Sequence, residues 1–139
     1  MKTFVVLAVS IVLVSILFCP LAMAAPPMPD DVKMVQPDPS LPKEIAGFWG
    51  KWEGGDPVMK LFIIVEKIGK EKANLYIWRS GVLPGTEGWE RLEAKVSKES
   101  GKNKLSYPNS RGSITWFVLN GENLDGLTPG GKARLSRVP

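Results

Sequence analysis

Carboxylates and aromatic rings are the side chains of this chain that can do chemistry. Its 139 residues include no histidine and a single cysteine, Cys19. These absences exclude histidine acid–base catalysis, Ser-His-Asp and Cys-His nucleophiles, and metal sites built from thiolates or imidazoles. Two facing carboxylates are enough to hydrolyse a glycosidic bond. Most acidic residues here stand beside Lys or Arg, which is typical of a solvated surface. We therefore predict no catalytic pair, no metal site and no cofactor, and expect that the protein is not an enzyme.

Five tryptophans give the chain a high density of large rings. One hypothesis is that a barrel interior binds an apolar or amphipathic small molecule, lined by Trp49, Leu61, Ile63, Trp78 and Trp116. The alternative is an interaction module, in which outer-face rings recognise a polysaccharide, an envelope component or a partner protein. The candidates for that outer patch are Trp52, Phe62, Trp78 and Trp89. Simple packing in the core competes with both hypotheses.

The first 24 residues have the layout of a secretory signal peptide. Lys2 precedes an uncharged stretch over residues 4–25, and Ala22-Met23-Ala24 supplies a small-x-small cleavage site. We expect cleavage after Ala24, and a secreted or periplasmic protein that has no membrane contact afterwards. Two alternatives stay open. The stretch is long enough to remain as an uncleaved membrane anchor, and Cys19 is a candidate lipoprotein acceptor.

Residues 25–44 form a proline-rich segment, with six prolines between Ala25 and Pro42. Proline at this density blocks both helices and central strands. The segment is predicted to be an extended tether that is either mobile or lying against the surface. Residues 41–45 are expected to make one short helical turn, with Pro42 at its first position.

Residues 45–139 are expected to form an all-β domain. Apolar runs alternate with turn residues, and Asn120-Gly121 between two such runs is a strong hairpin signal. Eight antiparallel strands in up-and-down order can close into a barrel, which removes exposed edges. The predicted strands are Phe48–Trp52, Val58–Ile68, Ala73–Trp78, Trp89–Ser97, Lys104–Tyr107, Ser113–Leu119, Leu124–Thr128 and Lys132–Val138.

The second predicted strand departs from simple alternation. Its one face is wholly apolar, with Met59, Leu61, Ile63 and Val65. The opposite face carries Phe62 and Ile64 between two charged residues, so its centre is apolar as well. A period of two with one wet face is the expected pattern for an antiparallel sheet.

The run Ile45-Ala46-Gly47-Phe48-Trp49-Gly50-Lys51-Trp52 resembles the start of the lipocalin-like, or calycin, barrels. The resemblance to compact exported bacterial members of that group implies that Gly47 and Trp49 sit at the base of the first strand. It also implies that Arg134 or Arg137 in the last strand packs over the indole and closes the barrel floor. The chain is shorter than a typical lipocalin, and it lacks the usual disulfide and the long helix.

The net charge of the whole chain is +4, and acidic and basic residues alternate along it. Nucleic-acid binding usually needs a concentrated basic stripe, which is absent from the sequence. We therefore expect no nucleic-acid partner. The sequence leaves the ligand and the oligomeric state open.

Overall fold

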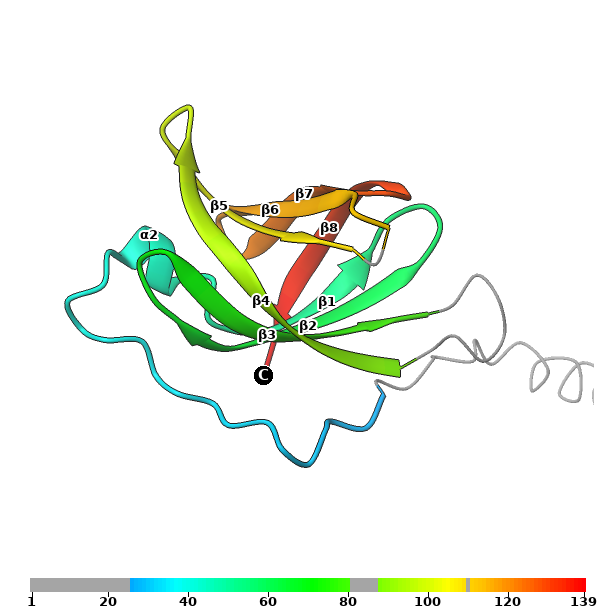
Figure 1. Cartoon of the computed structure of the whole chain (residues 1–139), viewed down its shortest axis with the longest axis horizontal. Coiled ribbons are helices and arrows are strands. Elements are labelled where there is room, and N and C mark those ends of the chain that lie inside the picture. The colour runs from blue at the N-terminus through cyan, green and yellow to red at the C-terminus, as the bar shows by residue number, and fades with distance from the viewer. Residues whose placement is uncertain (1–25, 81–87, 110) are drawn as a thin grey trace, which may run out of the picture.

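Eight antiparallel strands close into a barrel in this computed structural model, which describes residues 26–80, 88–109 and 111–139 (Figure 1). Each strand pairs with the next one along the chain, and β8 pairs with β1. The predicted up-and-down barrel and all eight of its strands are confirmed. Their bounds are β1 Gly50–Gly55, β2 Lys60–Ile68, β3 Lys72–Arg79, β4 Gly88–Glu99, β5 Lys102–Pro108, β6 Ile114–Asn120, β7 Asn123–Thr128 and β8 Gly131–Val138.

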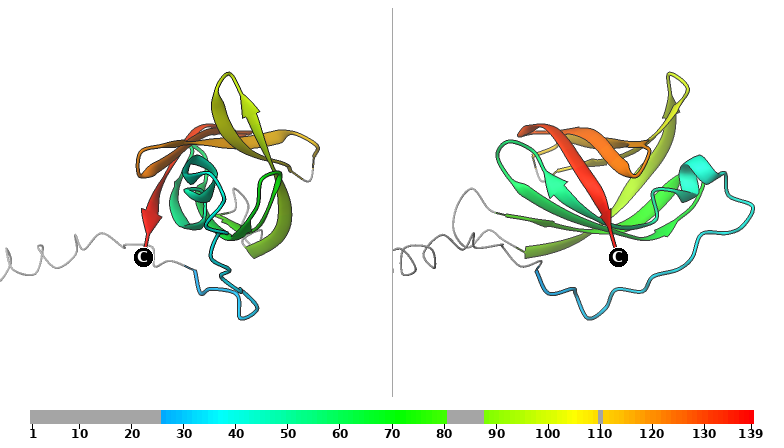
Figure 2. Two further views of the ribbon diagram at one scale, coloured as in Figure 1. Left: turned by 90° about the vertical axis from the view of Figure 1, so that its left-hand side faces the viewer. Right: turned by 180° about the vertical axis from the view of Figure 1, so that it is seen from behind.

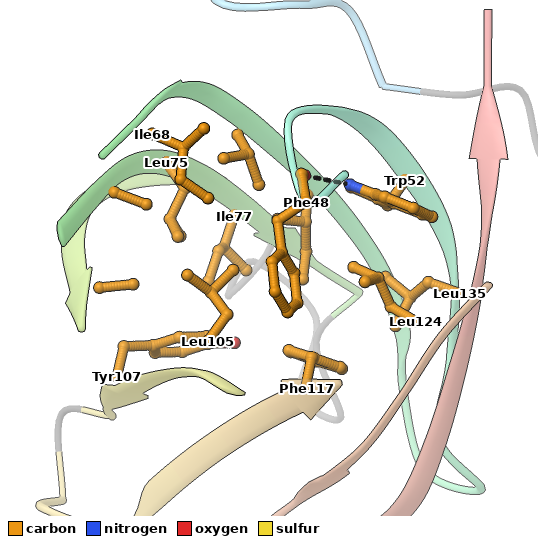
Figure 3. Close-up of a cluster of buried hydrophobic side chains, with 14 of the residues drawn as sticks. Phe48, Trp52, Ile68, Leu75, Ile77, Leu105, Tyr107, Phe117, Leu124 and Leu135 are labelled. Atoms are coloured by element: carbon orange, nitrogen blue, oxygen red, sulfur yellow. Dashed lines mark hydrogen bonds between the residues drawn. The ribbon is translucent and has the colours of Figure 1, made fainter. Parts of the chain in front are cut away.

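Inward-facing side chains fill the barrel (Figure 3). Leu61 and Ile63 of β2 are each 1% exposed, and Leu75, Phe117 and Leu135 are 0% exposed. These five side chains belong to one buried apolar cluster, of the kind that stabilises a small domain by apolar burial.

A short helix and a phenylalanine close one end of the barrel. Helix α2 spans Lys43–Ala46, as the predicted helical turn required, but Pro42 is its N-cap rather than its first residue. The Phe48 amide donates to the Ile45 carbonyl at 3.1 Å, so the chain is still turning there and β1 begins later than predicted. Phe48 is fully buried and points into the core (Figure 3).

Residues 26–38, called the strap below, run along the outer side of β2, β3 and β4 (Figures 1 and 2). They lead from the start of β4 to the end of the barrel that carries α2. Of the two states predicted for the proline-rich tether, the structure shows the one that lies against the surface. The strap makes hydrogen bonds to β2 and β4, which are described below.

The predicted signal peptide, residues 1–24, lies outside the described residues. Within the ranges that are described, no helix has both the length and the hydropathy to cross a bilayer.

Candidate functional site

A row of three aromatic rings crosses the outer face of the barrel. Phe62 of β2 pairs with Trp78 of β3, and Trp78 pairs with Trp89 of β4. The Phe62 and Trp78 rings meet edge to face, with centroids 5.5 Å apart, a favoured geometry for aromatic pairs. We call these three residues the aromatic row. It places large apolar surface where an antiparallel barrel usually carries polar side chains.

The aromatic row borders a buried layer that is separate from the core. Phe62, Ile64 and Tyr76 are only 6%, 3% and 4% exposed, yet they point outward and are not members of the core cluster. Two strap contacts frame this layer. Trp89 Nε1 donates to the Pro27 carbonyl at 2.8 Å, and the Val35 amide donates to the Glu66 carbonyl at 2.8 Å. The strap therefore covers the second apolar surface of β2.

Glu66 joins the strap to the barrel. The pairing of β2 with β3 shifts register between Val65 and Lys67, which is a β-bulge at Glu66. Its side chain is 4% exposed. It accepts from Arg91 Nη2 at 2.6 Å and from the Lys33 amide at 3.2 Å. Its carbonyl also accepts from Trp49 Nε1 at 3.3 Å.

The charges at this face follow from those contacts. The hydrogen bond to Glu66 and its negative charge raise the pKa of Arg91 above its ordinary value. The Arg91 guanidinium lies 5.4 Å from the centre of the Tyr76 ring, within cation–π range. Burial raises the pKa of Tyr76, and the nearby Asp31 of the strap raises it further. Among the described residues, the Tyr76 hydroxyl is buried without a hydrogen-bond partner.

The barrel floor is closed by a guanidinium over an indole. The guanidinium belongs to Arg137, one of the two arginines expected there, but the indole is that of Trp52 and not of Trp49. Arg137 lies 4.2 Å from the centre of the Trp52 ring. Trp52 is 1% exposed, and its Nε1 donates to the Phe48 carbonyl at 2.9 Å. Trp49 is half-buried at the edge of the core, and Arg134 is exposed and binds Asp125 at 2.6 Å. The correction follows from the start of β1 at Gly50, which turns Trp52 inward.

The five residues predicted to line an interior ligand site do not meet in one place. Leu61 and Ile63 lie inside the barrel, and Trp49 packs against the core at the closed end. Trp78 and Trp116 instead belong to the outer face, because their strand neighbours Ile77 and Phe117 point inward. Lys104 lies 4.7 Å from the Trp116 ring centre, on a different side of the barrel from the strap. The interior ligand stays a prediction.

The hydroxyl of Tyr107 is a buried polar group near the end of the barrel opposite α2. Tyr107 is 3% exposed, and burial raises the pKa of this hydroxyl to about 12. Arg79 Nη2, whose charge acts against that rise, binds Glu90 at 3.0 Å. Both ion-pair side chains are partly exposed, so the pair is screened by water.

Two hollows open on the surface of the barrel. One is lined by the turn between β1 and β2, residues 54–60, and the other by residues at the start of β7 and the end of β8. Both are wide open to solvent. No cluster of three carboxylates that could hold a metal occurs in the described ranges.

Sequence reasoning missed Glu66 and Arg91, because charged neighbours made them look solvated. The apolar centre of the outer face of β2 was the signal that something covers this side. The Trp52 closure also had a signal, since Gly50-Lys51-Trp52 repeats the Gly-x-Trp spacing of Gly47-Phe48-Trp49.

No protein-family model, curated protein or solved structure matches this chain.

Proposed function

We propose that this protein is an exported, non-catalytic binding module, and that it recognises a partner protein with the outer face of β2, β3 and β4. The observation that carries the proposal is the aromatic row of Phe62, Trp78 and Trp89 on that face. Aromatic side chains are enriched where proteins bind one another, because they supply large apolar area at little entropic cost.

The packing of the interior favours the outer surface as the working face. Leu61 and Ile63 are the two interior candidates best placed to touch a ligand inside the barrel, and each is 1% exposed. A ligand beside them would have to displace packed side chains. Binding at the outer face needs no such rearrangement of the core.

Peptide contacts favour a protein over a polysaccharide as the partner. The face already offers an indole donor to the Pro27 carbonyl and a carbonyl acceptor to the Val35 amide. These groups match the regular donors and acceptors of a polypeptide backbone.

Kinship with the lipocalin-like barrels is part of the proposal. Its support is the glycine at position 50, the indole of Trp52 and the Arg137 guanidinium 4.2 Å from that ring. This kinship supplies an expectation of a rigid exported scaffold. It assigns no ligand.

A site-specific photocrosslinker tests the proposal in cells that export the protein. Placed at Trp78, it is expected to give an adduct with a discrete partner protein, identified by mass spectrometry. Placed at Trp116, which is also a half-buried outer-face indole, it is expected to give none. Equal labelling from both positions, or adducts with glycan alone, would contradict a protein-binding face at β2–β4.

A further inference from the structure

The strap is held mainly through backbone atoms. Its contacts to the barrel include the Pro27 carbonyl at Trp89 and the amides of Lys33 and Val35 at Glu66. None of these three bonds uses a strap side chain. Another extended segment of similar backbone shape can therefore make the same bonds in the same place.

The burial pattern of the strap indicates which shape the face selects. Pro26, Pro29 and Val32 are half-buried, whereas the residues between them are exposed. The three-residue interval from Pro26 to Pro29 matches the period of the polyproline II helix. A turn in which the Val32 amide donates to the Pro29 carbonyl at 3.4 Å bends the chain after the prolines. Residues 26–29 have the Pro-x-x-Pro spacing that aromatic-lined grooves recognise in other binding modules.

An acidic pair, Asp30 and Asp31, follows these prolines. Arg91 lies beside this part of the strap, because the Glu66 carboxylate accepts from both Arg91 Nη2 and the amide of Lys33. The negative charge of Asp31 also raises the pKa of Arg91. Arg91 remains 56% exposed at its side chain while it binds Glu66. It therefore has accessible surface to attract an acidic group that follows the prolines of a bound segment.

The strap is only partly buried against this face. Met28, Met34 and Val35 of the strap remain 47%, 36% and 47% exposed. A segment that is so exposed and held by few bonds opens more readily than the barrel strands.

We infer that the outer face of β2–β4 is a recognition site for Pro-x-x-Pro segments followed by an acidic residue, and that the strap is its built-in occupant. This inference rests on the proposed function, since it names the class of partner for that face. A partner segment displaces residues 26–35 and takes over their bonds to Trp89 and Glu66. The strap competes at high effective concentration because it belongs to the same chain.

In the test, the strap is cut from the barrel after the whole chain has folded, so that the barrel forms with its strap in place. A protease site is inserted after Gln36, which is exposed and follows the last strap contact, and the exported chain is cut in the folded state. The probe is a labelled synthetic peptide of residues 25–36. Its binding is followed by fluorescence anisotropy after the original strap has been washed away. We expect the cut protein to bind the peptide at least about tenfold more tightly than the uncut protein.

Matched variants connect the binding to the named groups. Trp89→Phe keeps a ring but loses the N–H donor, and is expected to weaken peptide binding about fivefold. Trp116→Phe makes the same change on another side of the barrel and should leave binding unchanged. A peptide with Pro26 and Pro29 replaced by Ser should bind several-fold more weakly, because it loses the preformed extended shape.

Failure to bind is decisive if the cut barrel is still folded, as shown by circular dichroism. A strap that stays in place after cutting, and does not exchange with excess labelled peptide, would overturn the inference in favour of a fixed structural element. If cutting unfolds the barrel, hydrogen exchange of the uncut protein decides. The Lys33 and Val35 amides must then exchange by local opening faster than the amides of β2, and exchange at the global rate would overturn the inference. A Trp78 adduct without peptide binding leaves the proposed function standing and removes only the partner class.

Discussion

The guanidinium of Arg137 spans Trp52 and the backbone that leads into β1. It lies 4.2 Å from the indole centre and donates to the carbonyls of Gly47 at 2.7 Å and Trp49 at 2.8 Å. One side chain therefore fixes the last strand, the first strand and the α2 plug. Closure of the barrel by a terminal residue implies that the domain is completed only when β8 pairs with β1.

Replacing Arg137 by Met should destabilise the domain by about 2 kcal/mol, because it removes a cation–π contact and two charge-assisted hydrogen bonds. The measurement is urea denaturation of the mature protein, followed by tryptophan fluorescence. Arg134→Met is the control, since it removes only a surface pair with Asp125 and should cost less than about 1 kcal/mol. Equal losses for the two variants would contradict the closing role of Arg137.

Gly50→Ala should be strongly destabilising. Gly50 has a φ of 122°, and a Cβ there would lie 2.8 Å from Arg137 Nη1. The backbone strain alone costs about 1–3 kcal/mol, and displacement of Arg137 adds to it. Gly121→Asn is the matched control, because a φ of 61° with open space around it suits asparagine. A Gly50→Ala variant whose denaturation midpoint equals that of the wild type and of Gly121→Asn would contradict the strain at position 50.

Arg91 and Glu66 should be energetically coupled. Arg91→Ala leaves a carboxylate that is 4% exposed with the Lys33 amide as its remaining side-chain partner. We expect a loss of about 1–3 kcal/mol, which is moderated by the exposure of Arg91. A double-mutant cycle with Glu66→Gln is the measurement, and the two effects should be less than additive. Strict additivity would show that the pair does not interact.

The stability of the domain should fall at high pH through Tyr107. Its pKa rises from 10.0 to about 12 because burial disfavours the phenolate. The folded state therefore holds the proton more tightly, and this contribution is complete below pH 10 and lost as the pH passes through about 12. The loss is at most roughly 2–3 kcal/mol. Denaturation of wild type and Tyr107→Phe across this range should show the extra pH dependence in wild type alone.

Asp125 should contribute to acid sensitivity. Hydrogen bonds from Arg134 and Asn120 lower the pKa of Asp125 to about 2 from 3.8. The stabilisation is therefore present above pH 3.8 and is lost as the pH falls through about 2. Carboxyl titration by NMR should place Asp125 below the other surface aspartates. Arg134→Met should bring its pKa back toward the ordinary value, and an unchanged titration would refute the pairing.

The barrel was predictable because its information is local. Alternating apolar residues and turn pairs such as Asn120-Gly121 mark strands and hairpins without reference to distant parts of the chain. The closing tryptophan was not predictable in the same way. Two Gly-x-Trp spacings follow one another at residues 47–49 and 50–52, and the choice between them depends on the hydrogen bond from Phe48 to Ile45 that delays β1.

The outer face was harder to predict because its cover comes from far away in the sequence. Phe62 and Ile64 indicated a second apolar surface on β2. No residue near them in the sequence indicates that the strap is the segment that buries this surface. The inward or outward direction of Trp78 depends on its register with β2, where it pairs with Phe62. Register shifts of one residue reverse every later side chain, so periodicity alone does not settle them.

The path of the strap has a mechanical consequence. A force applied on the N-terminal side of Pro26 acts first on the hydrogen bond at Trp89 and then on those at Glu66, so that these bonds break one after another. The 13 residues of the strap, whose full contour length is roughly 45 Å, then straighten before tension reaches β1. Single-molecule stretching should record this yielding at low force, ahead of the rupture of the barrel, because a segment held by few hydrogen bonds opens before the paired strands do.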